Sequence, residues 1–295
     1  MTQFERYQQE LSKEYQRKFF MVVNEQDGDI DAALIDLKKE VERIVRRNTR
    51  FDNVDEGSIR TPLKEAIIAF MVLYGSTLTD YNVNVVRLQG ELMLKRLEQY
   101  DNGVFNDMVE KGTGALIVDT RKYFLKADNA IDGRSVADRI RFVQAGALKV
   151  VNDIITTDIK DEVGAKQLIS DIQNYIRKDD RKLWVGPFDW YRTRFGYKVN
   201  VVPVGRPMGS IDYNVFRIAR TEINNSWRNA TIKLNEGKRW VTGYRWNLSY
   251  SHPKQDICDD WAIPVYKTEK ELPDGHPHCM CYVTADMVDP SEIDI

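Results

Sequence analysis

The chain has 295 residues, of which 42% are hydrophobic and 30% are charged, and its formal net charge is −2. An apolar share of this size supports a packed core, which excludes an intrinsically disordered chain. No apolar run is long enough to span a bilayer, and the charged, amphipathic start does not resemble a signal peptide. We therefore expect synthesis in a reducing cytoplasm and no membrane partner.

Charge is distributed unevenly along the chain. Residues 177–250 carry 15 basic and 6 acidic side chains, whereas residues 251–295 carry 3 basic and 10 acidic ones. All six tryptophans also lie between Trp184 and Trp261. This change predicts a boundary near residue 177. We expect an α+β protein with a helical domain over residues 1–176, a smaller mixed α/β domain over 177–285, and an acidic, mobile tail over 286–295.

Apolar residues in the first hundred positions recur at steps of three and four, which indicates helices. One helix is predicted over residues 4–24 and a second over residues 29–47, with Gly28 breaking the chain between them. A third is expected to begin at Thr61-Pro62, a capping hydroxyl followed by proline, and to continue to about residue 100. These helices should pack as a bundle.

The next segment, residues 103–133, is rich in glycine and is predicted to be irregular. Within it, Ala115–Asp119 reads either as a short strand or as a buried helical turn. Ser135 is expected to cap a helix that runs to about Asp158, and a further helix is predicted over residues 165–178.

Aromatic, glycine and proline residues are frequent after residue 180, and Tyr197–Pro203 is the best candidate for a strand there. Asp212 is expected to cap a long helix over residues 213–236, which Gly237 ends. Apolar and polar residues then alternate over residues 240–250. This alternation predicts a strand with its tryptophans on one side.

A cluster of soft metal ligands follows that strand. All three cysteines and all three histidines of the chain lie within it, at Cys258, Cys279, Cys281, His252, His276 and His278. The Cys-x-Cys spacing places two sulfurs on one side of an extended segment. Thiolate and imidazole ligands are typical of zinc. The predicted structural zinc site consists of Cys258, His276, Cys279 and Cys281, with His252 and His278 as alternative ligands.

Two alternatives to a metal remain open for this cluster. One is a core of hydrogen-bonded histidines and buried thiols. The other is a disulfide such as Cys258–Cys281, which leaves one thiol over.

The basic segment suggests a second site, for nucleic acid. Lysines and arginines interleaved with tryptophan and tyrosine could follow phosphates and stack on bases. The candidate residues are Arg192, Arg194, Arg206, Arg217, Arg220, Arg228, Lys238 and Arg239. The alternative is that these side chains pair with carboxylates elsewhere in the chain.

Four short motifs occur in a specific order. They are Ala219-Arg220-Thr221-Glu222 on a helix, a strand containing Trp246, Asp256-Ile257-Cys258-Asp259, and His276–Cys281. In this order they resemble the phage Mu F-like minor head proteins, also described as phage head morphogenesis proteins. The resemblance covers about residues 130–285. It carries over the motif residues Arg220, Thr221, Glu222, Trp246 and Asp256, and the His/Cys set at 252, 258, 276, 279 and 281.

The resemblance implies a non-enzymatic minor structural protein of a tailed-phage head. Such proteins associate with the portal vertex and act in head assembly, DNA packaging or DNA delivery. The implied partners are the portal protein, other head proteins and DNA without sequence preference. The implied location is the virion, and the host cytoplasm during assembly. The helical residues 1–176 would then dock on the portal or capsid.

The alternative is an enzyme, a zinc-supported nuclease or hydrolase acting on nucleic acid. His252, Asp256 and Asp259 beside a metal could activate water if one coordination position stays open. Three thiolates at one zinc, however, are typical of closed structural sites. Arg220 and Glu222 are two residues apart and so lie on different helix faces. We expect Glu222 to pair with a neighbouring arginine rather than to act with Arg220.

Overall fold

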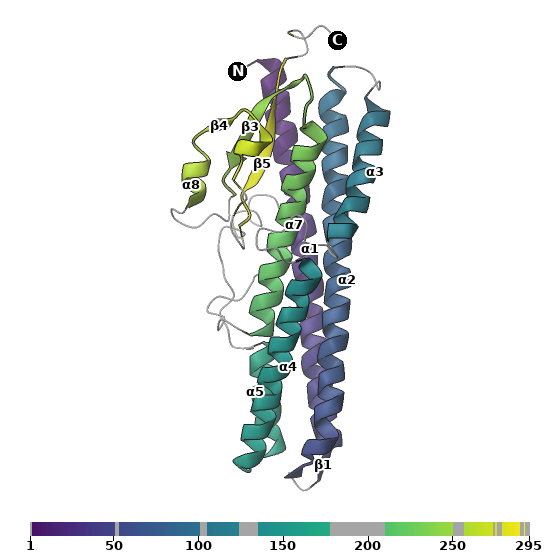
Figure 1. Ribbon diagram of the computed structural model, residues 1–295, viewed down its shortest axis with the longest axis vertical. Helices are drawn as coiled ribbons and strands as arrows, with labels where there is room; N and C mark the ends of the chain where they lie inside the picture. Colours follow the sequence, from purple (N-terminus) through teal and green to yellow (C-terminus); the bar gives the residue numbers. More distant parts are fainter. Residues whose placement is uncertain are drawn as a thin grey trace.

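Two long helices, α1 (Gln3–Arg47) and α2 (Glu56–Leu97), run antiparallel along the length of the molecule (Figure 1). The computed structural model describes residues 2–50, 53–100, 105–123, 135–177, 210–249, 257–273, 275, 279–289 and 292. A small antiparallel hairpin of β1 (Thr49–Arg50) and β2 (Asn53–Val54) joins α1 to α2. The other long helices among the described residues are α3 (Asn106–Tyr123), α4 (Val136–Lys160), α5 (Ala165–Ile176) and α7 (Ile211–Asn235). A three-stranded sheet follows them, so the predicted α+β class is confirmed.

Helix α1 is continuous through Gly28, so the predicted break there is wrong. A glycine inside a helix costs only about 1 kcal/mol relative to alanine. The apolar faces on both sides of Gly28, around Phe19 and Leu34, are buried, and this burial outweighs the cost. Thr2 and Glu5 close a capping box at the start of the helix, as neighbouring hydroxyl and carboxylate groups often do.

Helix α2 begins at Glu56, earlier than the predicted start at Thr61-Pro62. Asp55 caps it by accepting a hydrogen bond from the Gly57 amide at 3.1 Å. Pro62 therefore lies inside the helix, where it lacks an amide donor. The buried side chain of Ile59 belongs to the helical turn that precedes Pro62. Its packing explains why the helix begins before the proline.

Residues 106–123 form helix α3, where the sequence predicted irregular structure. Gly112, one of the glycines that suggested irregular structure, instead allows helices to approach closely, because a Cβ there would lie 3.3 Å from Leu234 Cδ2 of α7. Gly90 of α2 has the same effect, since a Cβ there would lie 2.4 Å from Thr113 Oγ1 of α3. Ala115–Asp119 is accordingly helical and not a strand.

The predictions for α4 and α5 are confirmed. Ser135 caps α4 in a capping box with Asp138, and α5 occupies the expected segment. Helix α7 begins two residues earlier than expected, with Ser210 as its N-cap, while buried Asp212 accepts hydrogen bonds from Ser210 Oγ and the Tyr213 amide. Gly237 follows the helix at φ 69°, a conformation that glycine adopts without strain. The strand predicted at residues 197–203 lies outside the described residues.

Helix α7 is common to three of the four apolar cores. It contributes Val215 to the core with α4 and α5, Trp227 to the core with the first half of α1, and Leu234 to the core with α3. Polar contacts add to this packing, because Tyr74 Oη donates to the Val215 carbonyl at 2.5 Å. Helix α7 follows the predicted boundary at residue 177 but shares its cores with earlier helices. The boundary itself stays a prediction.

The sheet packs beside the start of α1 and the end of α7 (Figure 1). Its central strand β3 (Val241–Asn247) pairs antiparallel with β4 (Val265–Tyr266) and β5 (Tyr282–Met287). An irregularity between Val241 and Gly243 interrupts the predicted alternation, so Thr242 is exposed although Trp246 is buried as expected.

Asp286 lies within β5, so the predicted mobile tail over residues 286–295 is wrong at this residue. Short helices α8 (Ile257–Trp261) and η1 (Glu269–Glu271) complete the described part.

Among the described residues, no helix combines the length and the apolar character that crossing a bilayer requires.

Candidate metal centre

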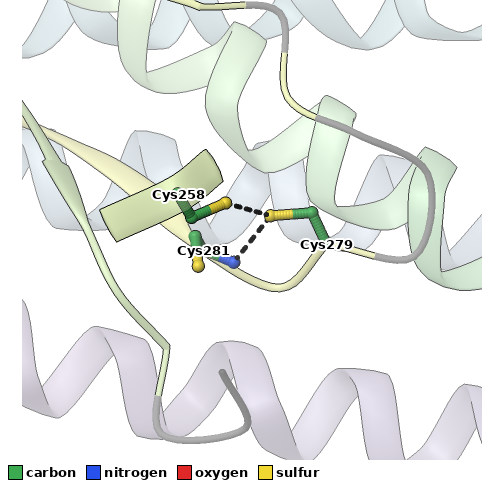
Figure 2. A group of neighbouring side chains, drawn as sticks. All are labelled: Cys258, Cys279 and Cys281. Carbon is green, nitrogen blue, oxygen red and sulfur yellow. Dashed lines mark hydrogen bonds between the residues drawn. The ribbon is translucent and has the colours of Figure 1, made fainter. Parts of the chain in front are cut away.

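The three cysteines meet in the interior of the sheet region (Figure 2). Cys258 comes from α8, and Cys279 and Cys281 from the extended segment that leads into β5. Their Sγ atoms all lie within 4.8 Å of one another, and Cys258 Sγ is 3.5 Å from Cys279 Sγ. The side chains are 0%, 3% and 1% exposed. All three are thiols, so the alternative of a Cys258–Cys281 disulfide is not realised in the structure.

Asn224 of α7 fixes the Cys-x-Cys segment in place. Its Nδ2 donates to the carbonyl of Cys279 at 2.7 Å and to that of Cys281 at 2.8 Å. Asn224 is fully buried, so both bonds are shielded from water. One amide group therefore attaches both cysteines to the helical bundle. Sequence reasoning missed this residue, because α7 buries several polar side chains and no local pattern distinguishes Asn224 among them.

Two backbone amides donate toward the sulfurs. The Cys281 amide lies 3.3 Å from Cys279 Sγ, and the Ser249 amide lies 3.4 Å from Cys281 Sγ. Such donors stabilise negative charge on sulfur and orient a thiolate for a metal. In the absence of a metal, the hydrogen bond with Cys279 and then burial raise the pKa of the Cys281 thiol well above its usual range. A metal that binds here must displace that proton.

The spacing of the thiols fits zinc. Zinc–sulfur bonds of about 2.3 Å in a tetrahedral arrangement place neighbouring sulfurs about 3.8 Å apart. The 3.5 Å between Cys258 Sγ and Cys279 Sγ is close to this value. Cys281 lies within the same 4.8 Å group and needs only a small adjustment. Three cysteines can therefore hold one metal ion, and a tetrahedral site would need a fourth ligand. His276, His252 and His278 lie outside the described residues.

Aromatic side chains enclose the thiols. Trp246 of β3 and Trp261 of α8 meet edge to face, with ring centroids 5.2 Å apart. The guanidinium of Arg228 lies 5.1 Å above the Trp246 ring, a cation–π contact. Arg228 also packs tightly on Gly275, where a Cβ would lie 1.8 Å from Nη1. The three thiols and both tryptophans belong to one apolar cluster, so the described residues shield the sulfurs from solvent.

The Arg220-Thr221-Glu222 motif lies on α7 and forms contacts inside the protein. Arg220 pairs with Asp27 of α1, with Nη2 2.6 Å from Oδ2, and Glu222 pairs with Arg139 of α4. The Thr221 hydroxyl donates to the backbone of its own helix at 2.7 Å. The expectation that Glu222 pairs with an arginine is confirmed. The pairing of Arg220 with Asp27 was not predicted.

The nucleic-acid candidates do not gather on one described surface. Arg220 and Arg228 are buried and make contacts within the protein, so their guanidinium groups do not face solvent. Arg217 and Lys238 are half-buried, and Arg239 is exposed. The remaining candidates, Arg192, Arg194 and Arg206, lie outside the described residues, as does the motif residue Asp256.

Comparison of this chain with family models, with curated proteins and with solved structures gave no match.

Proposed function

We propose that this chain is a non-enzymatic minor structural protein of a tailed-phage head. In this proposal it associates with the portal vertex and acts in head assembly, DNA packaging or DNA delivery. The supporting observation is how the motif helix is used. Arg220, Glu222 and Asn224 join α7 to α1, to α4 and to the Cys-x-Cys segment. Residues that join a helix to its neighbours in this way stabilise a fold. Arg220 and Glu222 belong to the ordered set of motifs that resembles the minor head proteins.

The proposed metal is zinc, with Cys258, Cys279, Cys281 and His276 as ligands and a structural role. Buried thiols within bonding range of one ion support this choice. When bound, zinc would supply cross-links between α8 and the Cys-x-Cys segment. The apolar cluster around the thiols is small, so the cross-links would replace packing that a larger core provides.

The proposed protein partners are the portal protein and other head proteins, which would dock on residues 1–176. Helix α2 supports this proposal, because Val72 and Leu73 are 68% and 55% exposed on it. Large apolar side chains that face water side by side are typical of surfaces that another protein covers.

We also propose DNA binding without sequence preference, through the basic side chains of residues 177–250 that remain accessible. Arg239 is the described residue that best supports it, because its side chain faces solvent. Binding through phosphates should weaken steeply as salt concentration rises.

The experiment that tests the proposed function is detection of the chain in purified phage particles. A full-length tagged copy is expected in the heads and should co-purify with the portal protein. Its absence from particles that contain the portal would contradict the proposal. A plasmid-nicking assay with added zinc, magnesium or manganese tests the alternative of a nuclease, and we expect no nicking above the buffer control.

A further inference from the structure

A polar pocket lies between the first turns of α1, the end of α2 and strands β3 and β5. Its volume is about 830 Å³. This volume falls within the range of small-molecule sites in proteins, about 300–1,000 Å³. Side chains that line it include Gln8, Ser12, Lys13, Arg96, Asn247 and Thr284. None of the three metal-binding cysteines belongs to its lining.

Arg96 supplies a buried positive charge to this pocket. Its side chain is 3% exposed. Nη2 donates to Ser12 Oγ at 2.6 Å and Nη1 to the Ala285 carbonyl at 3.4 Å, and both acceptors are neutral. Nε has no acceptor. Within the part of the chain that the structure describes, no carboxylate lies at ion-pair distance from Arg96. A buried charge in such surroundings is costly, and burial lowers the pKa of Arg96 to about 10.

The carboxylates that line the pocket already have partners. Asp286 accepts a hydrogen bond from Arg245 Nε at 2.7 Å, and Glu5 accepts one from the Thr2 amide at 2.7 Å. The pocket also contains exposed Lys13, for which the described residues offer no ion-pair partner. The Asp286 carboxylate favours the charged form of Arg96 from a distance, but burial outweighs it, so the positive charge of Arg96 is offset only in part by the described residues.

The amide of Gln8 adds a second unsatisfied group to the same pocket. Both Nε2 and Oε1 are buried and have no hydrogen-bond partner among the described atoms. Buried side-chain polar atoms in folded proteins nearly always have a partner. A donor and an acceptor beside a buried guanidinium suit a polar molecule that carries a negative group.

We propose that this pocket binds a small polar molecule through its oxyanion group, a carboxylate or a phosphate ester, with Arg96 as the counter-charge. Arg96 Nε and Gln8 Nε2 donate to the oxyanion, and Lys13 adds a second positive charge at the rim. This binding activity goes beyond the proposed structural role and does not depend on it.

Thermal unfolding of the full chain tests the proposal. The probes are sodium acetate and sodium phosphate, each compared with sodium chloride at equal pH and ionic strength. At saturation, we expect at least one oxyanion to raise the midpoint by about 3 °C above chloride. A rise with acetate alone assigns a carboxylate, and a rise with phosphate alone assigns a phosphate ester. No rise with either salt overturns the proposal.

Variants separate binding from the general stabilising effect of excluded salts. Arg96→Met removes the charge, and Gln8→Leu removes the amide donor while it leaves Arg96 unchanged. Both should lose the rise, whereas Arg87→Met, at an exposed arginine on the same helix, should retain it. Equal rises in the parent and in Gln8→Leu overturn the proposal. This comparison decides the question even if Arg96→Met fails to fold.

Equilibrium dialysis with radiolabelled phosphate and acetate gives a direct measurement. We expect one site per chain for the oxyanion that raises the midpoint, with at least about tenfold weaker binding in Gln8→Leu. A tenfold loss corresponds to about 1.4 kcal/mol. Binding of neither ion, or identical binding by the parent and the variant, overturns the proposal.

Discussion

Arg220 of α7 and Asp27 of α1 form a buried ion pair, with Nη2 2.6 Å from Oδ2 and side chains 5% and 4% exposed. The two residues are 193 positions apart in the sequence. Asp27 directly precedes Gly28, where the sequence predicted a break in the helix. The pair therefore attaches the middle of α1 to the motif helix. Its charges are shielded from water, so removing one partner leaves the other charge buried.

Asp27→Asn tests this pair. The change keeps the shape of the side chain but removes the charge opposite Arg220. We expect the free energy of unfolding to fall by about 3–5 kcal/mol, measured by urea denaturation. The double change Asp27→Leu with Arg220→Met should recover most of the loss. Asp36→Asn is the control, because Asp36 forms an exposed pair with Lys39 and should cost less than about 1 kcal/mol.

Asn224→Asp tests the attachment of the cysteines to α7. An ionised carboxylate has no hydrogen to donate to the carbonyls of Cys279 and Cys281, so both oxygens lose their donor. We expect a loss of about 2–4 kcal/mol in the free energy of unfolding and a weaker affinity for metal. Asn229→Asp, at an exposed position on the same helix, should change neither. Unchanged metal affinity in Asn224→Asp would show that this amide does not position the cysteines.

Gly90→Ala tests the close approach of α2 and α3. The added methyl would meet the Thr113 side chain, with Oγ1 at 2.4 Å and Cγ2 at 2.8 Å. Threonine in a helix has few alternative rotamers, so the helices must separate. We expect a loss of about 1–3 kcal/mol. Gly114→Ala and Gly146→Ala, which have open space around the new methyl, should instead gain about 0.5–1 kcal/mol. A gain in Gly90→Ala would contradict the packing.

Asp158 near the end of α4 should make stability depend on pH. Burial, followed by the negative charges of Asp171 and Asp161, raises the pKa of Asp158 above its ordinary value. A raised folded-state pKa means that the protonated form favours the fold. This contribution is present below the unfolded-state pKa of about 4 and is lost as pH rises through the folded-state pKa. Ionised Asp158 also lies at the unfavourable end of the helix dipole.

Asp158→Asn should therefore raise the free energy of unfolding at pH 7 by about 0.5–1 kcal/mol. The difference from the parent should shrink as the pH falls toward 4. Denaturation at several pH values measures it, with Asp153→Asn at an exposed position of the same helix as the control. A variant that is less stable than the parent at pH 7 would mean that the carboxylate has a stabilising partner.

Local patterns in the sequence predicted the helical faces well, because apolar periodicity reports directly which side of a helix is buried. Predictions failed where a residue type has two uses. Gly28 and Gly112 read as signals for a break or a turn, yet they lie within helices, and Gly112 permits close packing of α3 against α7. Similarly, Pro62 read as a helix start although Asp55 caps the helix earlier.

The cluster of three cysteines was predictable because Cys279 and Cys281 are two positions apart and Cys258 lies in the same short stretch. The contacts that support them were not predictable. Asn224 is 55 residues from Cys279, and Asp27 is 193 residues from Arg220. Such pairings depend on how helices pack, which no local spacing encodes. The pocket around Arg96 escaped prediction for the same reason, because its walls come from α1, α2 and the sheet.

Metal analysis of freshly purified protein tests the central claim most directly. We predict about one zinc per chain in the parent and in Met280→Leu, a control between two of the cysteines that keeps all three thiols. Cys279→Ser should lose most of the zinc, and His276→Ala should lose it if His276 is the fourth ligand. Chelation should unfold the sheet region and leave the helices α1 and α2 intact. A parent without metal, whose melting curve is unchanged by a chelator, would contradict the zinc site and indicate a hydrogen-bonded thiol core.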